Sequence, residues 1–211
     1  MNRVPRRLVF SVSATAATLI ALSAGADDGA FRADGTSNGV QVERRSVSGS
    51  SFDELRLSTT SRLSVESLCN AIYPKALSSR PERRFKKQEL LRETDSDRWT
   101  YEQISVPVVS DRDYVMHVRL DQPGSSGRCS VSFFTENDPA HPPVDGFVRI
   151  PVIRGHWDVF PVGDGTVSVQ YKIWSEPGGG VPAFMARGGQ KSAAVDFMKI
   201  ILARAGQSPA P

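Results

Sequence analysis

Apolar and polar residues alternate through most of the second half of the chain, and this period of two predicts β-strands. We expect strands at residues 85–92, 98–106, 113–120, 129–136, 146–152, 156–162 and 166–174. Turn-forming sequences such as Gly163-Asp164-Gly165 separate most of them. The connections are short, so neighbouring strands should be mostly antiparallel, because a parallel pair needs a long crossover.

The chain before residue 85 reads as two strands and a helix. Strands are predicted at 40–47 and 52–59, with turn residues between them. A short helix follows at 64–72, and Ser64 is a suitable N-cap for it. Residues 27–38 contain glycine, aspartate and serine without periodicity, so we interpret them as a flexible linker.

The chain closes with an amphipathic helix predicted at 181–205, followed by a disordered tail at 206–211. Pro182 lies in the first turn, where proline is tolerated. The apolar face is broad and includes Phe184, Met185, Val195, Met198, Ile201 and Leu202. The whole pattern predicts an α+β domain over residues 39–205, in which a curved antiparallel sheet of about nine strands wraps around this helix.

The first residues form a separate segment. Residues 1–26 begin with basic residues, continue with a soft apolar stretch and end in small residues at Ala24-Gly25-Ala26. This order is typical of a cleaved secretory signal peptide. Serines and threonines dilute the stretch, which disfavours a stable bilayer span. We therefore expect an exported protein, periplasmic or secreted after cleavage of the signal peptide.

Cleavage after Ala26 changes the charge balance. The full sequence has 26 Lys and Arg against 23 Asp and Glu, and the leader would remove three arginines, which leaves 26 − 3 = 23 basic residues against 23 acidic ones. A net charge near zero removes the main argument for a nucleic-acid partner. No later apolar run approaches the length of a membrane span.

Two cysteines, Cys69 and Cys129, are an even pair in a chain that we expect to reach an oxidising compartment. One disulfide between them is one interpretation. The other is a pair of separately buried thiols, because the sequence does not show whether their Cα atoms come within bridging range.

No catalytic constellation stands out. The G-x-S-x-G elbow is absent, and serine, histidine and aspartate have no spacing that signals a hydrolase. His117, His141 and His156 form no metal-binding pattern, and the two cysteines are far apart in the sequence. The residues therefore indicate a protein without catalytic activity, bound metal or cofactor.

Strand parity defines two stripes of side chains that share a face. One consists of Arg112, Tyr114, Met116 and Val118, and the other of Val167, Val169, Tyr171 and Ile173. In a strongly curved sheet such stripes can line an apolar volume, and pockets of about 300–1,000 Å³ bind small molecules. The alternative is that these side chains fill a solid core, which the pattern alone favours.

One run of the sequence resembles a known motif. Pro107-Val108-Val109-Ser110-Asp111-Arg112-Asp113-Tyr114-Val115 is similar to the P-x-P-V-S-x-R-D-[FY]-V motif of START domains, the steroidogenic acute regulatory protein-related lipid-transfer family. Three more pieces follow in the family's order: Gly146-Phe147-Val148-Arg149 resembles G-x-V-R, Gly155-His156-Trp157 resembles G-x-W, and residues 176–182 resemble D-P-x-G-x-x-P. The resemblance covers residues 39–205, which is essentially the whole predicted domain.

The resemblance implies a helix-grip fold around an internal hydrophobic cavity for a sterol, a phospholipid or another hydrophobic molecule. On this sequence the implied cavity residues are Arg112, Tyr114, Met116, Val118, Glu102, Phe133, Val148, Val169, Tyr171 and Ile173. The implied lid consists of the loop at 136–145 and the C-terminal helix, with Pro139, His141, Pro142, Phe184, Met185, Val195 and Met198.

Family members often place a charged pair inside the cavity, and this sequence departs from that pattern. Glu102 matches the acidic member, but Val118 occupies the position of the basic one. Arg112 is therefore the better candidate for orienting a ligand headgroup. The alternative is a structural ion pair of Arg112 with Asp111, Asp113 or a neighbouring strand.

The resemblance and the leader together predict an exported, non-enzymatic START-like protein that binds a lipid or sterol-like molecule for transport or sequestration. We expect a monomer with transient membrane contact and no nucleic-acid partner. Two alternatives stay open. One is a helix-grip enzyme that acts on a hydrophobic substrate through Tyr114, Glu102 and Arg112, and the other is a structural accessory domain of the envelope.

Overall fold

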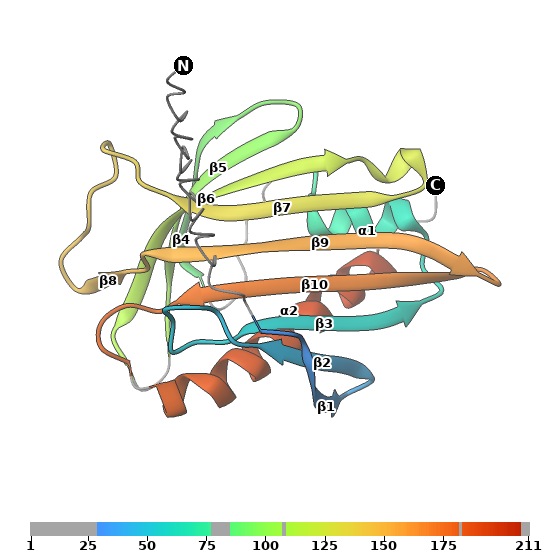
Figure 1. The fold of residues 1–211 in the computed structure, drawn as a ribbon. Coiled ribbons are helices and arrows are strands. Elements are labelled where there is room, and N and C mark those ends of the chain that lie inside the picture. The colour runs from blue at the N-terminus through green and yellow to red at the C-terminus, as the bar shows by residue number, and fades with distance from the viewer. Residues whose placement is uncertain (1–28, 77–84, 107–108, 182, 208–211) are drawn as a thin grey trace, which may run out of the picture.

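A largely antiparallel sheet of ten strands curves around a long C-terminal helix (Figure 1). The structure is a computed structural model that describes residues 29–76, 85–106, 109–181 and 183–207. The strands are β1 (Arg32–Ser37), β2 (Val40–Arg45), β3 (Glu54–Ser61), β4 (Phe85–Glu93), β5 (Asp97–Ile104), β6 (Asp111–Gln122), β7 (Cys129–Glu136), β8 (Phe147–Arg149), β9 (Val152–Gly163) and β10 (Thr166–Glu176). The helices are α1 (Val65–Ile72), the short 3-10 helix η1 (Gly124–Ser126) and α2 (Ala183–Gln207). The predicted α+β helix-grip class is confirmed.

The sheet follows the order β1-β2-β3-β10-β9-β7-β6-β5-β4, so the first three strands meet the last one. The short β8 lies outside this path and pairs with β6 in parallel. Pro151 separates β8 from β9, since a proline has no N–H to continue a ladder. Within the antiparallel part, Glu102 lies opposite Tyr114 and Thr100 opposite Met116, so these side chains share the concave face.

Two predicted boundaries are wrong. Residues 32–37 are strand β1, whereas a flexible linker was expected over 27–38. β1 and β2 join through a tight turn at Asn38 and Gly39, whose φ angles are 52° and 78°. Asn-Gly is a hairpin signal in its own right, and the polar composition of the segment hid it. At the other end, α2 continues to Gln207, past the start of the expected tail; the predicted signal peptide lies outside the described residues.

Both α1 and the much longer α2 pack on the concave side of the sheet. α1 begins after Ser64, whose hydroxyl accepts a hydrogen bond from the Ser67 N–H at 3.1 Å and so acts as an N-cap. A disulfide joins Cys69 of α1 to Cys129 of β7, with the Cα atoms 5.6 Å apart. No helix in the described ranges is long and apolar enough to cross a membrane. The buried residues of α2 are Ala194, Val195, Met198, Ile201 and Ala205.

An aromatic cluster fills the space between the sheet and α2. Trp157 stacks on Tyr171 with ring centroids 4.1 Å apart, and Phe197 of α2 meets both rings edge-on at 5.8 Å. Phe133 lies 5.9 Å from Tyr171 and rests on Gly155, where a Cβ would come within 2.2 Å of its ring. Buried aromatic side chains of this size contribute strongly to stability, so this cluster holds α2 to the sheet.

Candidate ligand-binding site

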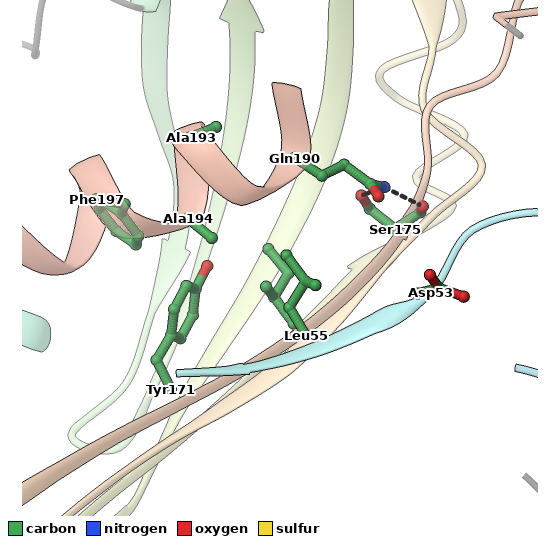
Figure 2. Close-up of a pocket in the computed structure, with 9 residues that line it drawn as sticks. Asp53, Leu55, Tyr171, Ser175, Gln190, Ala193, Ala194 and Phe197 are labelled. Carbon is green, nitrogen blue, oxygen red and sulfur yellow. Dashed lines mark hydrogen bonds between the residues drawn. The ribbon is translucent and has the colours of Figure 1, made fainter. Parts of the chain in front are cut away.

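A small pocket opens between α2 and the strands β3 and β10 (Figure 2). Its volume is about 130 Å³. It is lined by Asp53, Leu55, Tyr171, Ile173, Ser175, Gln190, Ala193, Ala194 and Phe197. At its mouth the Gln190 amide donates to the Ser175 carbonyl at 3.3 Å. Tyr171 and Ile173 are predicted cavity residues, whereas the small residues of α2 that leave the space have no distinctive sequence pattern.

An ionic group beside this pocket ties α2 to the first strands. Arg44 donates to Asp53 at 3.2 Å and to Asp34 of β1 at 2.5 Å. Lys191 of α2 lies 3.1 Å from the same Asp34 carboxylate. Burial raises the pKa of Asp34, but the hydrogen bonds from Arg44 and Lys191 outweigh it and hold the pKa below its ordinary value. The segment expected to be a linker therefore fastens the helix.

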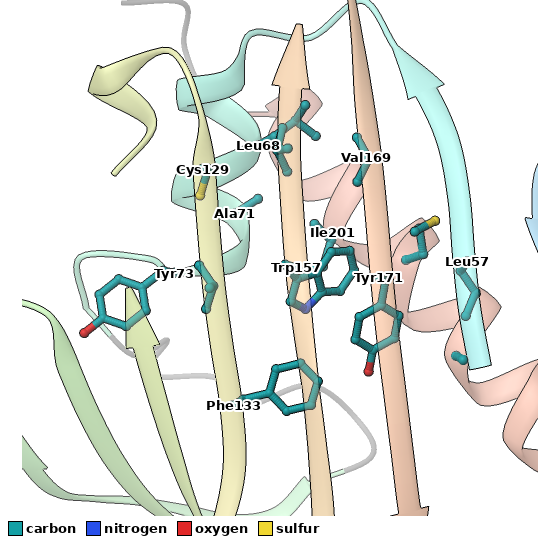
Figure 3. Close-up of a cluster of buried hydrophobic side chains, with 14 of the residues drawn as sticks. Leu57, Leu68, Ala71, Tyr73, Cys129, Phe133, Trp157, Val169, Tyr171 and Ile201 are labelled. Carbon is teal, nitrogen blue, oxygen red and sulfur yellow. The ribbon is translucent and has the colours of Figure 1, made fainter. Parts of the chain in front are cut away.

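Several other predicted cavity and lid residues fill the core instead (Figure 3). Val169 and Met198 are fully buried, and Phe133 and Val195 pack in the same cluster. In this part of the sheet the solid-core alternative describes the structure. Val148 lies beneath the β10–α2 loop, where a Cβ on Gly179 would come within 3.1 Å of it. The side chains of Phe184 and Met185, two expected lid residues, lie outside the described ones.

The concave face of β4, β5 and β6 is different, because it carries buried polar side chains. Glu102 is only 7% exposed, and one of its carboxylate oxygens accepts from Gln88 Nε2 at 2.8 Å and from Thr100 Oγ1 at 2.9 Å. Among the described residues no basic side chain pairs with it. Tyr114 and Met116 lie beside it and are also buried. A carboxylate held only by neutral donors is available to a donor from a ligand.

The basic residue nearest in register to Val118 is Arg98, directly across from it on β5. Arg98 is buried, donates to Glu93 at 2.8 Å and to the Pro74 carbonyl at 2.8 Å, and lies over the Tyr73 ring. A guanidinium is thus present on this face, but it comes from the neighbouring strand and is already paired. The sequence alone could not find it, because strand register decides which residue lies opposite Val118.

Among the described residues Arg112 does not form the ion pair that was considered from the sequence. Its side chain is 3% exposed, and its acceptors are the backbone carbonyls of Ser110, Pro177 and Gly178, with the last two at 3.3 and 3.4 Å. Pro177 and Gly178 belong to the loop between β10 and α2. Arg112 therefore joins the end of β6 to the segment that leads into the C-terminal helix.

The next residue, Asp113, points to the opposite face and holds a second loop. Its carboxylate accepts from Arg149 at 3.0 and 2.8 Å and from the Tyr101 hydroxyl at 3.1 Å. Arg149 in turn donates to the His141 and Pro142 carbonyls at 3.1 Å, so it fixes the loop between β7 and β8. The hydrogen bond with Asp113 raises the pKa of Arg149. Pro139 and Pro142 themselves are exposed in that loop.

A second hollow of about 510 Å³ lies outside the grip. Its lining residues are Glu89, Leu90, Leu91, Arg92, Trp99, Val115, Glu136, Asn137, Asp138, Ala140 and His141. Trp99 lies between the Arg92 guanidinium and the stacked His117 ring, and His141 stacks on Tyr101. This hollow is therefore separate from the concave face that packs against α2.

A curved sheet that grips a C-terminal helix, with a pocket between the two, defines a START-like domain, and the chain has this fold. The STAR-related lipid transfer protein of Xanthomonas axonopodis (fragment 25–204) is 25% identical, with a TM-score of 0.72 over 84% of this chain and 99% of that chain. Human StAR-related lipid transfer protein 5 is 17% identical, with a TM-score of 0.72 over 84% of this chain and 86% of that chain.

Two further comparisons extend the picture. An uncharacterized protein of Pseudomonas aeruginosa is 29% identical over 191 residues, which cover 85% of this chain and 87% of that protein. The Zhui aromatase/cyclase of a Streptomyces species is 12% identical, with a TM-score of 0.51 over 74% of this chain and 94% of that chain, and this likeness concerns the fold alone. No protein-family model matches the chain.

Proposed function

We propose that this protein binds a lipid or another hydrophobic small molecule between its sheet and α2, for transport or sequestration. The observation that carries the proposal is the likeness, in both fold and sequence, to the STAR-related lipid transfer protein of Xanthomonas axonopodis across nearly the whole described domain. The pocket beside Tyr171 and Phe197 supports it, because its walls are mostly apolar and it lies where a gripped ligand would lie.

The size of the pocket sets a requirement for this function. About 130 Å³ is below the roughly 300–1,000 Å³ that ligand sites usually have. Binding a lipid therefore requires α2 to move outward or side chains of the core to rearrange. The loops held by Arg112 and Arg149 are the segments whose release would permit such movement, and we assign them the role of a lid.

The proposal includes export to the periplasm or the cell exterior. Residues 1–26 have the layout of a signal peptide, and the Cys69–Cys129 disulfide supports an oxidising compartment. We further propose a monomer that contacts a membrane only while it loads or releases its ligand. A carrier of this kind needs neither a cofactor nor a protein partner.

The test is to purify residues 27–211 from cells, extract the protein with organic solvent and identify bound molecules by mass spectrometry. We expect a lipid in stoichiometric amount. A matched pair of helix variants locates it: Ala194→Leu fills the pocket and should lower the amount of bound lipid, whereas Ala203→Leu on the exposed face of α2 should not. Protein without lipid that also ignores a broad lipid panel would contradict the proposal.

The same extraction separates a carrier from an enzyme. Since one solved structure of this fold is an aromatase/cyclase, the fold does not exclude chemistry on the ligand. A carrier returns an added ligand with unchanged mass after prolonged incubation, whereas an enzyme returns a product. We expect unchanged mass, because the 25% identical protein of Xanthomonas axonopodis is a lipid transfer protein.

A further inference from the structure

Arg112 is a buried cation that lacks an anionic partner. Its guanidinium is almost fully shielded from solvent, yet its hydrogen-bond acceptors are three backbone carbonyls. Two of these bonds, to Pro177 and Gly178, are long for a charged donor. Burial lowers the pKa of Arg112, and the nearby Asp111 opposes this effect.

The carboxylates that flank Arg112 in the sequence are engaged elsewhere. Asp111 pairs with Lys86 and accepts from Ser105 at 3.2 Å. Asp113 points to the other face of the sheet and pairs with Arg149 at 2.8 Å. Within the described ranges no carboxylate lies in ion-pairing distance of the Arg112 guanidinium. This absence is unusual, because buried charges in proteins are normally paired.

We propose that Arg112 binds the anionic group, a phosphate or a carboxylate, of a lipid headgroup, and that this group displaces the Pro177 and Gly178 carbonyls. The inference rests on the proposed function and specifies its ligand class. Guanidinium hydrogen bonds to an anion are roughly twice as strong as those between neutral groups, and a planar guanidinium can bind phosphate or carboxylate with two parallel bonds. An anion is therefore the better partner for this buried cation.

Displacement of the two carbonyls would release the start of the helix. The loop continues as Gly178-Gly179-Gly180, with φ angles of 67°, 64° and 67°, which side chains other than glycine rarely adopt. A Cβ on Gly179 would come within 3.4 Å of an Arg112 nitrogen and 3.1 Å of Val148, so the loop packs directly on the guanidinium. Headgroup binding and lid opening would thus be linked through one side chain.

Glu102 refines the ligand class. It is on the concave face of the neighbouring strand, two register positions away from Arg112, and no basic residue pairs with it in the described chain. A headgroup with an ammonium next to its phosphate would satisfy both side chains, whereas a purely anionic headgroup would satisfy only Arg112. Zwitterionic lipids should therefore bind at least as well as anionic ones.

The experiment measures headgroup selectivity, which a purely structural role of Arg112 would not change. Wild type, Arg112→Gln, Arg112→Lys and Arg128→Gln are each incubated with an equimolar mixture of dioleoyl phosphatidylethanolamine, dioleoyl phosphatidylglycerol and dioleoylglycerol. The bound lipids are quantified by mass spectrometry. Arg128→Gln is the control, because it also removes a guanidinium, but one that is exposed and pairs with Asp158.

We expect Arg112→Gln to lower the ratio of phospholipid to dioleoylglycerol about tenfold. Arg112→Lys should lower it less, and Arg128→Gln should leave it unchanged. An unchanged ratio in both Arg112 variants would overturn the inference, as would a wild type that binds only dioleoylglycerol, while the proposed function would stand. A wild type that binds none of the three lipids would instead contradict the proposed function.

A titration with inorganic phosphate alone distinguishes a headgroup from a free anion. We expect no heat of binding, because the proposed site forms only when the lipid tail occupies the grip. Heat that disappears in Arg112→Lys would mean that the site takes free phosphate, and it would overturn the assignment to a lipid.

Discussion

The two halves of the sheet use their concave faces differently. The half made of β2, β3, β10, β9 and β7, which we call the scaffold half, packs apolar and aromatic side chains such as Leu57 and Trp157 against both helices. The half made of β4, β5 and β6, which we call the polar half, buries Glu102 and Arg112 on the same face. The buried charges are thus concentrated in the polar half, whereas the pocket beside Tyr171 lies against the scaffold half.

The physical reason for this division is that close apolar packing and buried charge conflict. A close-packed apolar core gains its stability from contacts that a buried charged group would interrupt. Buried polar residues lower stability unless they are paired, so they are tolerated only where the rest of the fold is stable enough to compensate. The disulfide between Cys69 and Cys129 links α1 to β7 of the scaffold half and adds to this stability.

Among the changes considered, removal of Trp157 from the scaffold half should lower the free energy of unfolding most. Trp157 is 2% exposed and stacks on Tyr171, so Trp157→Ala leaves a large cavity. We expect a loss of about 3–5 kcal/mol in the free energy of unfolding, measured by urea denaturation. Phe134→Ala on the outer face, where the ring is 37% exposed, is the control and should lose about 1 kcal/mol or less. Equal losses would show that the aromatic cluster is not the main anchor.

The disulfide provides the second largest effect. It closes a loop across a sequence separation of 60, and its loss increases the entropy of the unfolded chain. The double variant Cys69→Ser/Cys129→Ser should unfold with about 2–4 kcal/mol less free energy than the oxidised wild type. Wild type kept in a reductant is the control and should match the double variant. A double variant as stable as oxidised wild type would exclude a stabilising role for the bond.

A smaller and pH-dependent effect is expected on the convex side of the polar half. Asp97 of β5 accepts from Arg119 at 2.7 Å, and this bond, with those from Ser96 and His117, holds its pKa well below the ordinary 3.8. A depressed pKa stabilises the fold above the unfolded-state pKa, and this stabilisation is lost as the pH falls through the folded-state pKa.

Asp97→Asn should therefore be less stable than wild type at pH 7, and the difference should shrink as the pH falls below about 4. Thermal unfolding between pH 7 and pH 2 measures it. Asp196→Asn on the exposed face of α2 is the control and should follow wild type throughout. A difference that stays constant with pH would mean that the Asp97 charge is not involved.

The smallest effect on stability is expected for Glu102, although its replacement should have a clear effect on ligand binding. Glu102→Gln keeps the shape of a buried side chain that has no ion pair to lose, so its free energy of unfolding should change by about 1 kcal/mol or less. Leu57→Asn is the counterpart in the scaffold half and should lose about 3 kcal/mol, because it buries an unsatisfied amide. Similar losses in both variants would remove the distinction between the halves.

Local patterns in the sequence were sufficient to predict most strands and the cap of α1. Strand alternation is set by neighbours along the chain, and Ser64 forms its cap bond within the same turn. β1 was missed because its composition is polar: Asp34 bonds Arg44 and Lys191 and does not fill a hydrophobic face. The parallel pairing of β8 with β6 likewise has no local signature.

The candidate site was harder to predict for the same reason. Alternation correctly put Tyr171 and Ile173 on the pocket side, but it could not separate lining residues from filling ones such as Val169. Nor could it find Ala194, since a small residue marks space only once its neighbours are known. Arg112 was singled out, yet its acceptors are backbone carbonyls of a distant loop, and carbonyls carry no sequence information.

The position of β10 between β3 and β9 also determines the order in which the chain can assemble. Leu55 pairs with Ile173, so β1, β2 and β3 join the rest of the sheet only through β10, at the end of the domain. Contacts that span so much of a chain slow folding and leave strand edges exposed. Strands β1, β2 and β3 can pair with one another, but the outer edge of β3 stays open until residues 166–176 are available, and we expect a chaperone to protect this edge.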